Sequence, residues 1–197
     1  MDLEALRRRL TVEEINAMPL KHYEGPVYVI RLLDDWKKAL PDILSDKILG
    51  FDTETRPTFR KGKTNDPALI QLATEKAVYL IQLAWIPLGS YLTDILANPD
   101  ILKVGVGISS DMRELSKIHE FNPAGLIDLG TIARQAKLSS QGLRTLAANL
   151  FGFRISKGSQ CSNWSLMELS QKQIAYAATD AWIGRKIFLR MRELGIA

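Results

Sequence analysis

Residues 48–55 (ILGFDTET) open as an apolar strand and then carry two carboxylates, Asp52 and Glu54, two positions apart. Side chains on a strand alternate between its faces, so both carboxylates point to the same side, about 6.5 Å apart along the chain. Like charges held this close repel each other. The strand end therefore favours a site where a cation offsets the two charges.

Two more acidic residues fall on predicted core elements. Asp111 follows the apolar run 102–108 in the first turn of a predicted helix, where an acidic residue also suits the helix macrodipole. Asp180 lies one helical turn after Tyr176, although aspartate is unfavourable inside helices. No lysine or arginine stands three or four positions from Asp180, and a buried carboxylate needs a positive partner. The small residues near it indicate a helix face that packs closely on a sheet: Ala177, Ala178, Ala181 and Gly184. A solvated aspartate beside a core tyrosine is the alternative.

The four carboxylates together favour metal-dependent chemistry. They are Asp52, Glu54, Asp111 and Asp180. If they converge, hard divalent cations such as Mg²⁺ or Mn²⁺ offset their repulsion. Two such ions about 4 Å apart are the standard arrangement for hydrolysing a phosphodiester, because one polarises the attacking water and the other stabilises the leaving oxygen. A structural cation site without catalysis is the alternative.

The elements that position these residues alternate in a recognisable order. A helical arm runs to about residue 25, a strand covers 27–32 and a helix 34–44. Strand-like runs at 48–55, 68–74 and 77–83 form an antiparallel meander, and Glu75-Lys76 predicts a tight hairpin between the last two. Then helices and strands alternate: helix 90–98, strand 102–108, helix 109–119 with a serine cap, strand 125–129, helices to 137 and over 141–151, and a long last helix. That helix begins near Ser170 with a capping box. The order predicts an α/β fold: a mixed sheet, with a three-strand antiparallel meander plus parallel strands, flanked by helices.

Three segments carry a family resemblance as a set. FDTET, VGVGISSD and YAATD resemble the motifs of the DEDD superfamily of ribonuclease-H-like 3′–5′ exonucleases. The spacing from Tyr176 to Asp180 marks the tyrosine-bearing (DEDDy) subgroup, because Ala175 stands where the sister subgroup has histidine. The segments GFDTET, ALIQL and KGSQCSNWS are similar to the Werner-type exonuclease domains, and ribonuclease D is more distantly similar. The resemblance covers about residues 27–187.

The resemblance implies a role for each motif residue. Asp52, Glu54 and Asp180 would hold one ion, and Asp52 would bridge to a second that Asp111 reaches. The Tyr176 hydroxyl would hold the attacking water. The implied activity is a two-metal-ion 3′–5′ exonuclease that releases 5′-mononucleotides from nucleic acid, with DNA favoured. A ribonuclease-D-like RNA trimming enzyme, or a catalytically silent nucleic-acid-binding module of the same fold, are the alternatives.

Further residues are candidate contacts for the nucleic acid. They are Thr53, Arg56, Arg60, Lys61, Lys63, Lys157, Asn163 and Trp164. The basic residues after Glu54 lie next to the expected ions and suit phosphate binding, although a solvated hairpin loop has the same composition. Trp164 suits stacking on a base, and an ordinary core position fits it equally well. Asp128, at the end of a short strand, is expected to be structural, with support of the site as the alternative.

Composition limits the remaining possibilities. With 197 residues, of which 46% are hydrophobic and 24% charged, we expect one globular domain over residues 26–197, preceded by the arm over 1–25. Cys161 is the single cysteine, so no internal disulfide forms and a reducing, cytoplasmic location is expected. There is no signal-peptide pattern and no run long enough to span a membrane. The net charge of +4 mildly favours a polyanionic partner such as nucleic acid. A monomer is the default expectation, and the sequence identifies no helicase or repair partner.

Overall fold

The computed structural model describes residues 6–58 and 65–197, and these contain one six-stranded mixed sheet. Its strands follow the order β1-β4-β3-β2-β5-β6. Their bounds are β1 Val27–Ile30, β2 Ile48–Thr55, β3 Pro67–Ala73, β4 Val78–Gln82, β5 Leu102–Gly105 and β6 Leu126–Asp128. The meander β2-β3-β4 is antiparallel, whereas β1 on β4, β5 on β2 and β6 on β5 are parallel. The predicted fold class is confirmed.

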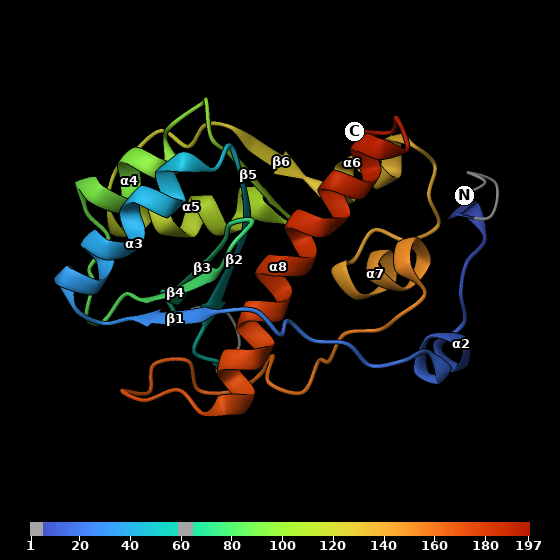
Figure 1. The fold of residues 1–197 in the computed structure, drawn as a ribbon, viewed down its shortest axis with the longest axis horizontal. Helices are drawn as coiled ribbons and strands as arrows, with labels where there is room; N and C mark the ends of the chain where they lie inside the picture. The colour runs from blue at the N-terminus through green and yellow to red at the C-terminus, as the bar shows by residue number, and fades with distance from the viewer. Residues whose placement is uncertain (1–5, 59–64) are drawn as a thin grey trace.

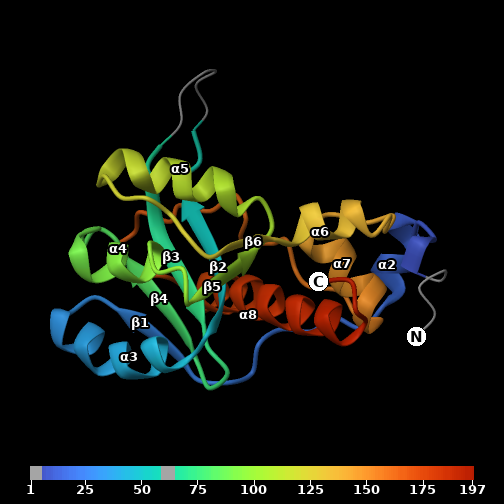
Figure 2. The same ribbon diagram turned by 90° about the horizontal axis from the view of Figure 1, so that it is seen from above.

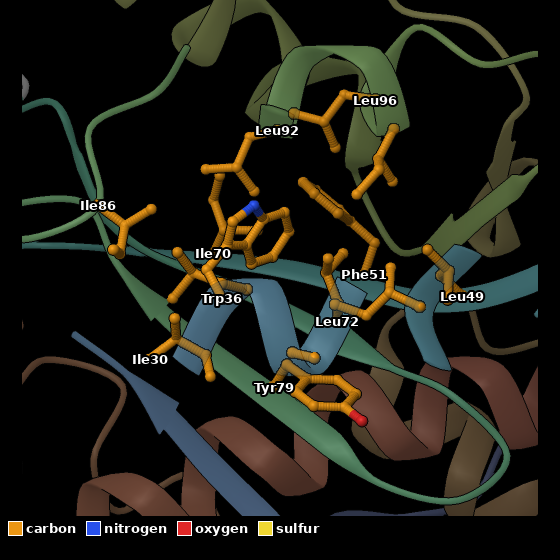
Figure 3. Close-up of a cluster of buried hydrophobic side chains, with 14 of the residues drawn as sticks. Ile30, Trp36, Leu49, Phe51, Ile70, Leu72, Tyr79, Ile86, Leu92 and Leu96 are labelled. Carbon is orange, nitrogen blue, oxygen red and sulfur yellow. The ribbon is translucent and has the colours of Figure 1, made fainter. Parts of the chain in front are cut away.

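One face of the sheet carries large apolar side chains under three helices. These helices are α3 (Leu33–Ser45), α4 (Ser90–Leu96) and α5 (Ile108–Ile118), which lie on the same side of the sheet (Figure 2). Trp36 of α3 is 1% exposed and lies among Ile70, Ile86 and Leu92 in the main hydrophobic cluster (Figure 3). Phe51, whose side chain points to this face, belongs to the same cluster. Because side chains alternate along β2, the next residue, Asp52, must point to the opposite face.

The opposite face is covered by the long helix α8 (Gln171–Glu193), which crosses the sheet (Figure 1). Ala177, Ala178 and Ala181 lie against this face in a shared apolar cluster. The approach is close, because a Cβ atom at Gly50 of β2 would overlap the carbonyl oxygen of Ala181. The small residues of both elements therefore allow the helix backbone to rest on the strand, as the sequence pattern predicts. This contact brings Asp180 to the face that carries Asp52.

The N-terminal arm packs beside the C-terminal half of α8. It contains the short helix α2 (Val12–Ala17), which begins at a capping box formed by Thr11 and Glu14. Leu6 is buried in a cluster with residues of α6 (Leu129–Gln135), α7 (Leu143–Phe151) and α8. Backbone hydrogen bonds join the segment after α2 to the segment after α7: Arg154 N donates to Pro19 O and Lys21 N donates to Arg154 O, both at 2.9 Å. In its described residues the arm is thus only partly helical, and its remainder runs extended along the domain.

Two details differ from the prediction. The helix predicted to begin at a serine cap instead has Gly107 as its N-cap, with φ 75° and no side-chain cap, so the serine cap is wrong. The left-handed conformation of Gly107 lets the chain turn from β5 directly into α5. The strand accordingly ends at Gly105, whereas the predicted strand reaches residue 108.

The capping box at Ser170 is confirmed, because the Ser170 hydroxyl accepts from Gln173 N and the Gln173 side chain accepts from Ser170 N. In the described residues no helix is long and apolar enough to cross a membrane.

Candidate active site

The acidic end of β2 and the middle of α8 line one pocket. Glu54 is 8% exposed and Asp180 is 7% exposed, and both line this pocket together with Asp52 and Tyr176. Asp52 and Glu54 share the strand face that meets α8, which is the face predicted from the alternation of side chains. We call this hollow the carboxylate pocket.

Asp111 joins the group from the first turn of α5. The Thr53 hydroxyl donates a 2.9 Å hydrogen bond to Asp111 Oδ1, so Asp111 is held beside the end of β2. The charges of Asp111 and Asp180 both act on Asp52. The structure thus brings together Asp52, Glu54, Asp111 and Asp180, from β2, α5 and α8, as the sequence predicts.

Burial raises the pKa values of these carboxylates, and mutual repulsion adds to the shift for Asp52 and Glu54. The pKa of Asp52 lies well above its ordinary value because of burial, then the charges of Asp180 and Asp111. Burial, and after it the charges of Asp52, Asp180 and Asp111, raises the pKa of Glu54 to about 9. Burial also raises the pKa of Asp180 to about 7 and that of Asp111 to about 6, opposed by a hydrogen bond from Tyr176 and from Thr53 respectively. Such raised values mean that the ionised set lacks a compensating positive charge.

The donor set fits divalent ions in its chemistry. It offers hard carboxylate oxygens from three elements and no competing soft ligand, which suits Mg²⁺ or Mn²⁺. Among the described residues, however, no three His, Cys, Asp or Glu side chains already stand in the geometry of a formed metal site.

Tyr176 lies beside the carboxylates as a neutral hydrogen-bond donor. Its hydroxyl interacts with the Asp180 side chain, which lies one helical turn away and lines the same pocket. Burial, then the charges of Asp180 and Glu54, raises the pKa of Tyr176 above its ordinary value. The phenol consequently stays protonated at neutral pH, and the residue can position a polar group in the pocket rather than act as a strong base.

The predicted stacking of Trp164 on a nucleic-acid base is wrong. Its side chain is 0% exposed and packs with Leu80, Ala177 and Ala178 behind the pocket. The Trp164 ring lies 6.0 Å from the Tyr176 ring between centroids, at an angle of 39°. The core alternative is correct because this loop residue fills the gap that the small residues of α8 leave. Trp164 therefore supports Tyr176 from behind.

The other candidate contacts divide between three places. Thr53 and Lys157 line the carboxylate pocket. Arg56 lines a different hollow, with Trp164 and Leu166. The Asn163 side chain is used locally, because its Oδ1 accepts from Ser165 N at 3.1 Å. Arg60, Lys61 and Lys63 lie outside the described residues.

Asp128 has a structural role with an electrostatic effect on the site. It is the N-cap of α6, where its side chain accepts from Thr131 N at 2.9 Å, and it also accepts from Gly107 N at 2.8 Å. Its charge raises the pKa of Asp111. Asp128 thus fixes the turn that begins α5 and so the helix that carries Asp111.

The sequence analysis missed a group of residues that complete the pocket wall. They are Gly142, Arg144 and Thr145 at the start of α7, and Gln160 in the following loop. Arg144 had one available signal: a cation in the first turn of a helix is unfavourable with the macrodipole and so calls for an explanation.

Comparison with known proteins assigns the chain to a family. The sequence model of the 3′–5′ exonuclease family matches residues 28–195, and the chain belongs to this family. It is 33% identical over 190 residues to the mouse bifunctional 3′-5′ exonuclease/ATP-dependent helicase WRN, covering 90% of this chain and 13% of that protein. The predicted resemblance to the exonuclease superfamily and to the Werner-type domains is confirmed. The chain spans only a small part of the curated relatives that it matches.

Solved structures show the same fold. The EXO domain of Nibbler from Aedes aegypti is 26% identical, with a TM-score of 0.79 over 91% of this chain and 93% of that one. RNase D from Escherichia coli has a TM-score of 0.73 over 86% of this chain and 46% of that one. At 24% identity, RNase D shares the fold, as expected for the more distant relative.

Proposed function

We propose that this chain is a 3′–5′ exonuclease that hydrolyses phosphodiester bonds at the 3′ ends of nucleic acid with two Mg²⁺ or Mn²⁺ ions and releases 5′-mononucleotides. The observation that carries the proposal is the convergence of four carboxylates from elements far apart in the sequence, three of which line one pocket with Tyr176. Family membership supports it, because the matched family is that of 3′–5′ exonucleases. DNA is the proposed preferred substrate.

The metal ions would be held by the chain's own oxygen donors. Asp52, Glu54 and Asp180 are proposed to hold one ion, with Asp52 shared and Asp111 reaching the other. When bound, the ions supply positive charge for the phosphodiester and activate water. A related protein supports this choice: the EXD2 exonuclease domain, 30% identical to this chain with a TM-score of 0.50, has been solved from crystals soaked in Mn.

The protein groups around the carboxylates orient the reactants. The protonated Tyr176 hydroxyl, fixed by Asp180 in front and by Trp164 behind, is proposed to hold the attacking water by a hydrogen bond. Lys157 brings a positive charge to the same pocket, where a phosphate would have to approach three acidic residues. Ile155 contributes an apolar residue to the wall of the same pocket.

A labelled-strand assay tests the activity. The protein is incubated with 5′-labelled single-stranded, duplex and recessed DNA, and with matched RNA, in Mn²⁺. We expect a ladder that shortens stepwise from the 3′ side for the native chain, and intact strands for Asp180→Asn. Asp100→Asn serves as the matched control, because Asp100 is an exposed aspartate outside the pocket.

Each alternative has its own outcome in this assay. Faster digestion of RNA than of DNA would favour an RNA trimming enzyme of the ribonuclease D type. Strands that are bound but stay intact with the native chain after long incubation would favour a silent binding module. Undiminished cleavage by Asp180→Asn would contradict the assignment of the catalytic site.

A further inference from the structure

Arg144 of α7 brings a positive charge to the carboxylate pocket. In the sequence it stands between the motifs that contain Asp111 and Asp180. The residue stands in the first turn of α7 and lines the pocket together with Thr145, Lys157 and Gln160. None of the exonuclease motifs that pointed to the carboxylates includes it. Its position nevertheless places it in the wall of the pocket that holds Asp52, Glu54 and Asp180.

The guanidinium of Arg144 is incompletely satisfied by the protein. In the part of the chain that the structure describes, Arg144 forms no ion pair with an acidic side chain. Its Nε atom is buried and has no hydrogen-bond partner among residues 6–58 and 65–197. A cation in the first turn of a helix also meets the positive end of the macrodipole. A buried donor without a partner is costly, and no acidic side chain offsets the charge, so the protein by itself stabilises this guanidinium poorly.

Asn16 of the N-terminal arm holds the other side of the same guanidinium. Arg144 Nη2 donates to Asn16 Oδ1 at 2.6 Å, although the two residues are 128 positions apart. The backbone of Asn16 is itself anchored, because Arg154 Nε donates to Asn16 O at 3.2 Å. The amide is neutral, so it fixes the orientation of Arg144 without cancelling its charge.

We propose that Arg144 is a substrate-binding residue whose guanidinium contacts a phosphate of the nucleic-acid strand, and that Asn16 is the positioning residue that aims it. The inference rests on the proposed function and adds the arm to the substrate site. Arginine presents several N–H donors in a fixed plane, which matches the oxygens of a phosphate. A phosphate also supplies the negative charge that the first turn of α7 favours.

Binding and cleavage by Arg144 variants test the proposal. Fluorescence anisotropy of a labelled single strand gives Kd as a function of salt for Arg144→Ala, for Arg144→Lys and for the control Arg190→Ala. Arg190 is half-buried on α8, forms an ion pair with Glu193 and is not among the residues that line the pocket. For Arg144→Ala we expect Kd and KM to rise about 10-fold and kcat to change by less than about 3-fold, with the slope of log Kd against log salt reduced by about 0.7. Arg144→Lys should recover part of the affinity and the full salt slope.

Two variants of Asn16 separate positioning from a purely structural role. Asn16→Asp keeps an acceptor for Nη2 but adds a negative charge that competes with the phosphate, whereas Asn16→Ala only removes the acceptor. We expect Asn16→Asp to weaken strand binding at least as much as Asn16→Ala while matching the native chain in thermal stability. If Asn16 merely braced the arm, Asn16→Asp would bind normally and Asn16→Ala alone would lose both stability and affinity.

Other outcomes have distinct meanings. A Kd and a salt slope for Arg144→Ala equal to those of Arg190→Ala would overturn the proposal. Anisotropy measures strand binding and does not require cleavage. A native chain that binds the strand but does not digest it would therefore contradict the proposed function, and the effect of Arg144→Ala on Kd could still be measured.

Discussion

Thr53 Oγ1 donates a 2.9 Å hydrogen bond to Asp111 Oδ1 and so joins the acidic end of β2 to the first turn of α5. The backbone N–H of the same residue donates to Asp52 Oδ1, also at 2.9 Å. Thr53 thus orients two carboxylates on different elements. This role is enough to explain why a threonine stands between Asp52 and Glu54, and the explanation does not require a contact with nucleic acid.

Replacement of this hydroxyl should change the titration of Asp111. A hydrogen bond donated to a carboxylate favours its ionised form, and the Thr53 bond accordingly lowers the pKa of Asp111; burial outweighs this effect, so the pKa is still raised to about 6. In Thr53→Val the bond is lost, so the pKa of Asp111 should rise further. Carboxyl ¹³C chemical shifts of the metal-free protein measure it. Thr53→Ser keeps a hydroxyl and should resemble the native chain, and an unchanged Asp111 pKa in Thr53→Val would show that the bond is not maintained in solution.

The metal-free protein should lose stability as the pH rises. The folded-state pKa is about 9 for Glu54 and about 7 for Asp180, both above the ordinary values of 4.5 and 3.8. The folded state therefore binds more protons than the unfolded state between about pH 4 and 9, and the free energy of unfolding falls with increasing pH in that window. With a chelator present, we expect a Tm lower by at least about 5 °C at pH 8.5 than at pH 5.5.

Two additions make that measurement specific to the carboxylate pocket. Asp180→Asn removes one of the repelling charges, so its Tm should depend less on pH. Mn²⁺ should raise the Tm of the native chain at pH 8.5 and have little effect on Asp180→Asn. A metal-free Tm that increases between pH 5.5 and 8.5 would mean that other groups dominate.

Loss of the Tyr176 hydroxyl should slow turnover with little effect on binding. Its raised pKa keeps the phenol protonated, so its contribution is a positioned hydrogen bond. For Tyr176→Phe we expect kcat to fall about 100-fold and KM to change by less than about 3-fold, as for removal of one oriented polar group. Tyr91→Phe is the control, since Tyr91 is exposed on α4. An equal loss of kcat in both variants would show that the loss does not depend on the position of Tyr176 in the pocket.

A methyl group at Gly50 should displace α8. The added Cβ would overlap the Ala181 carbonyl oxygen, which belongs to backbone and cannot rotate away. We expect Gly50→Ala to lower the free energy of unfolding by about 3 kcal/mol, at the upper end of overpacking effects, and to abolish cleavage because Asp180 moves with the helix. Urea unfolding and the labelled-strand assay measure the two effects. At Gly89 the nearest atom would be 3.9 Å away, so Gly89→Ala should leave both unchanged.

Gln71 is a place where the protein can be stabilised. Its side chain is 0% exposed, faces Asp52 across the β2–β3 pairing, and neither of its amide atoms has a partner among the described atoms. Gln71→Leu should therefore raise the free energy of unfolding by about 1–2 kcal/mol. Gln82→Leu should lower it, because Gln82 Nε2 donates to Leu166 O at 3.0 Å. Chemical denaturation measures both, and a destabilised Gln71→Leu would indicate bound water at that amide.

Local pattern explains which parts of the structure were predictable. The bounds of β2 agree with residues 48–55 because alternation and an apolar start define a strand from neighbouring residues alone. The capping box at Ser170 likewise acts within four residues. Asp52, Glu54 and Asp180 were accessible for the same reason, since acidic residues stand out on apolar elements.

Tertiary contacts explain what the sequence could not show. The burial of Trp164 depends on how much space the small residues of α8 leave, which no window around position 164 contains. The bond between Thr53 and Asp111 and that between Asn16 and Arg144 join residues 58 and 128 positions apart. The cap at Gly107 was missed because two serines follow it and a side-chain cap is the commoner pattern.

The resting of α8 on β2 ties enzymatic competence to the integrity of the whole sheet. Asp180 reaches its neighbours only while the helix lies flat on Gly50, and the Arg185 side chain holds it there through a 2.9 Å bond to Ile48 O and an ion pair with Asp46. A transient lifting of this one helix would separate the acidic groups and relieve their repulsion at the same moment. Bound divalent ions would then stabilise the packing of α8 on β2 in addition to supporting hydrolysis. The helix would therefore be held most firmly on the sheet in the metal-bound, active protein.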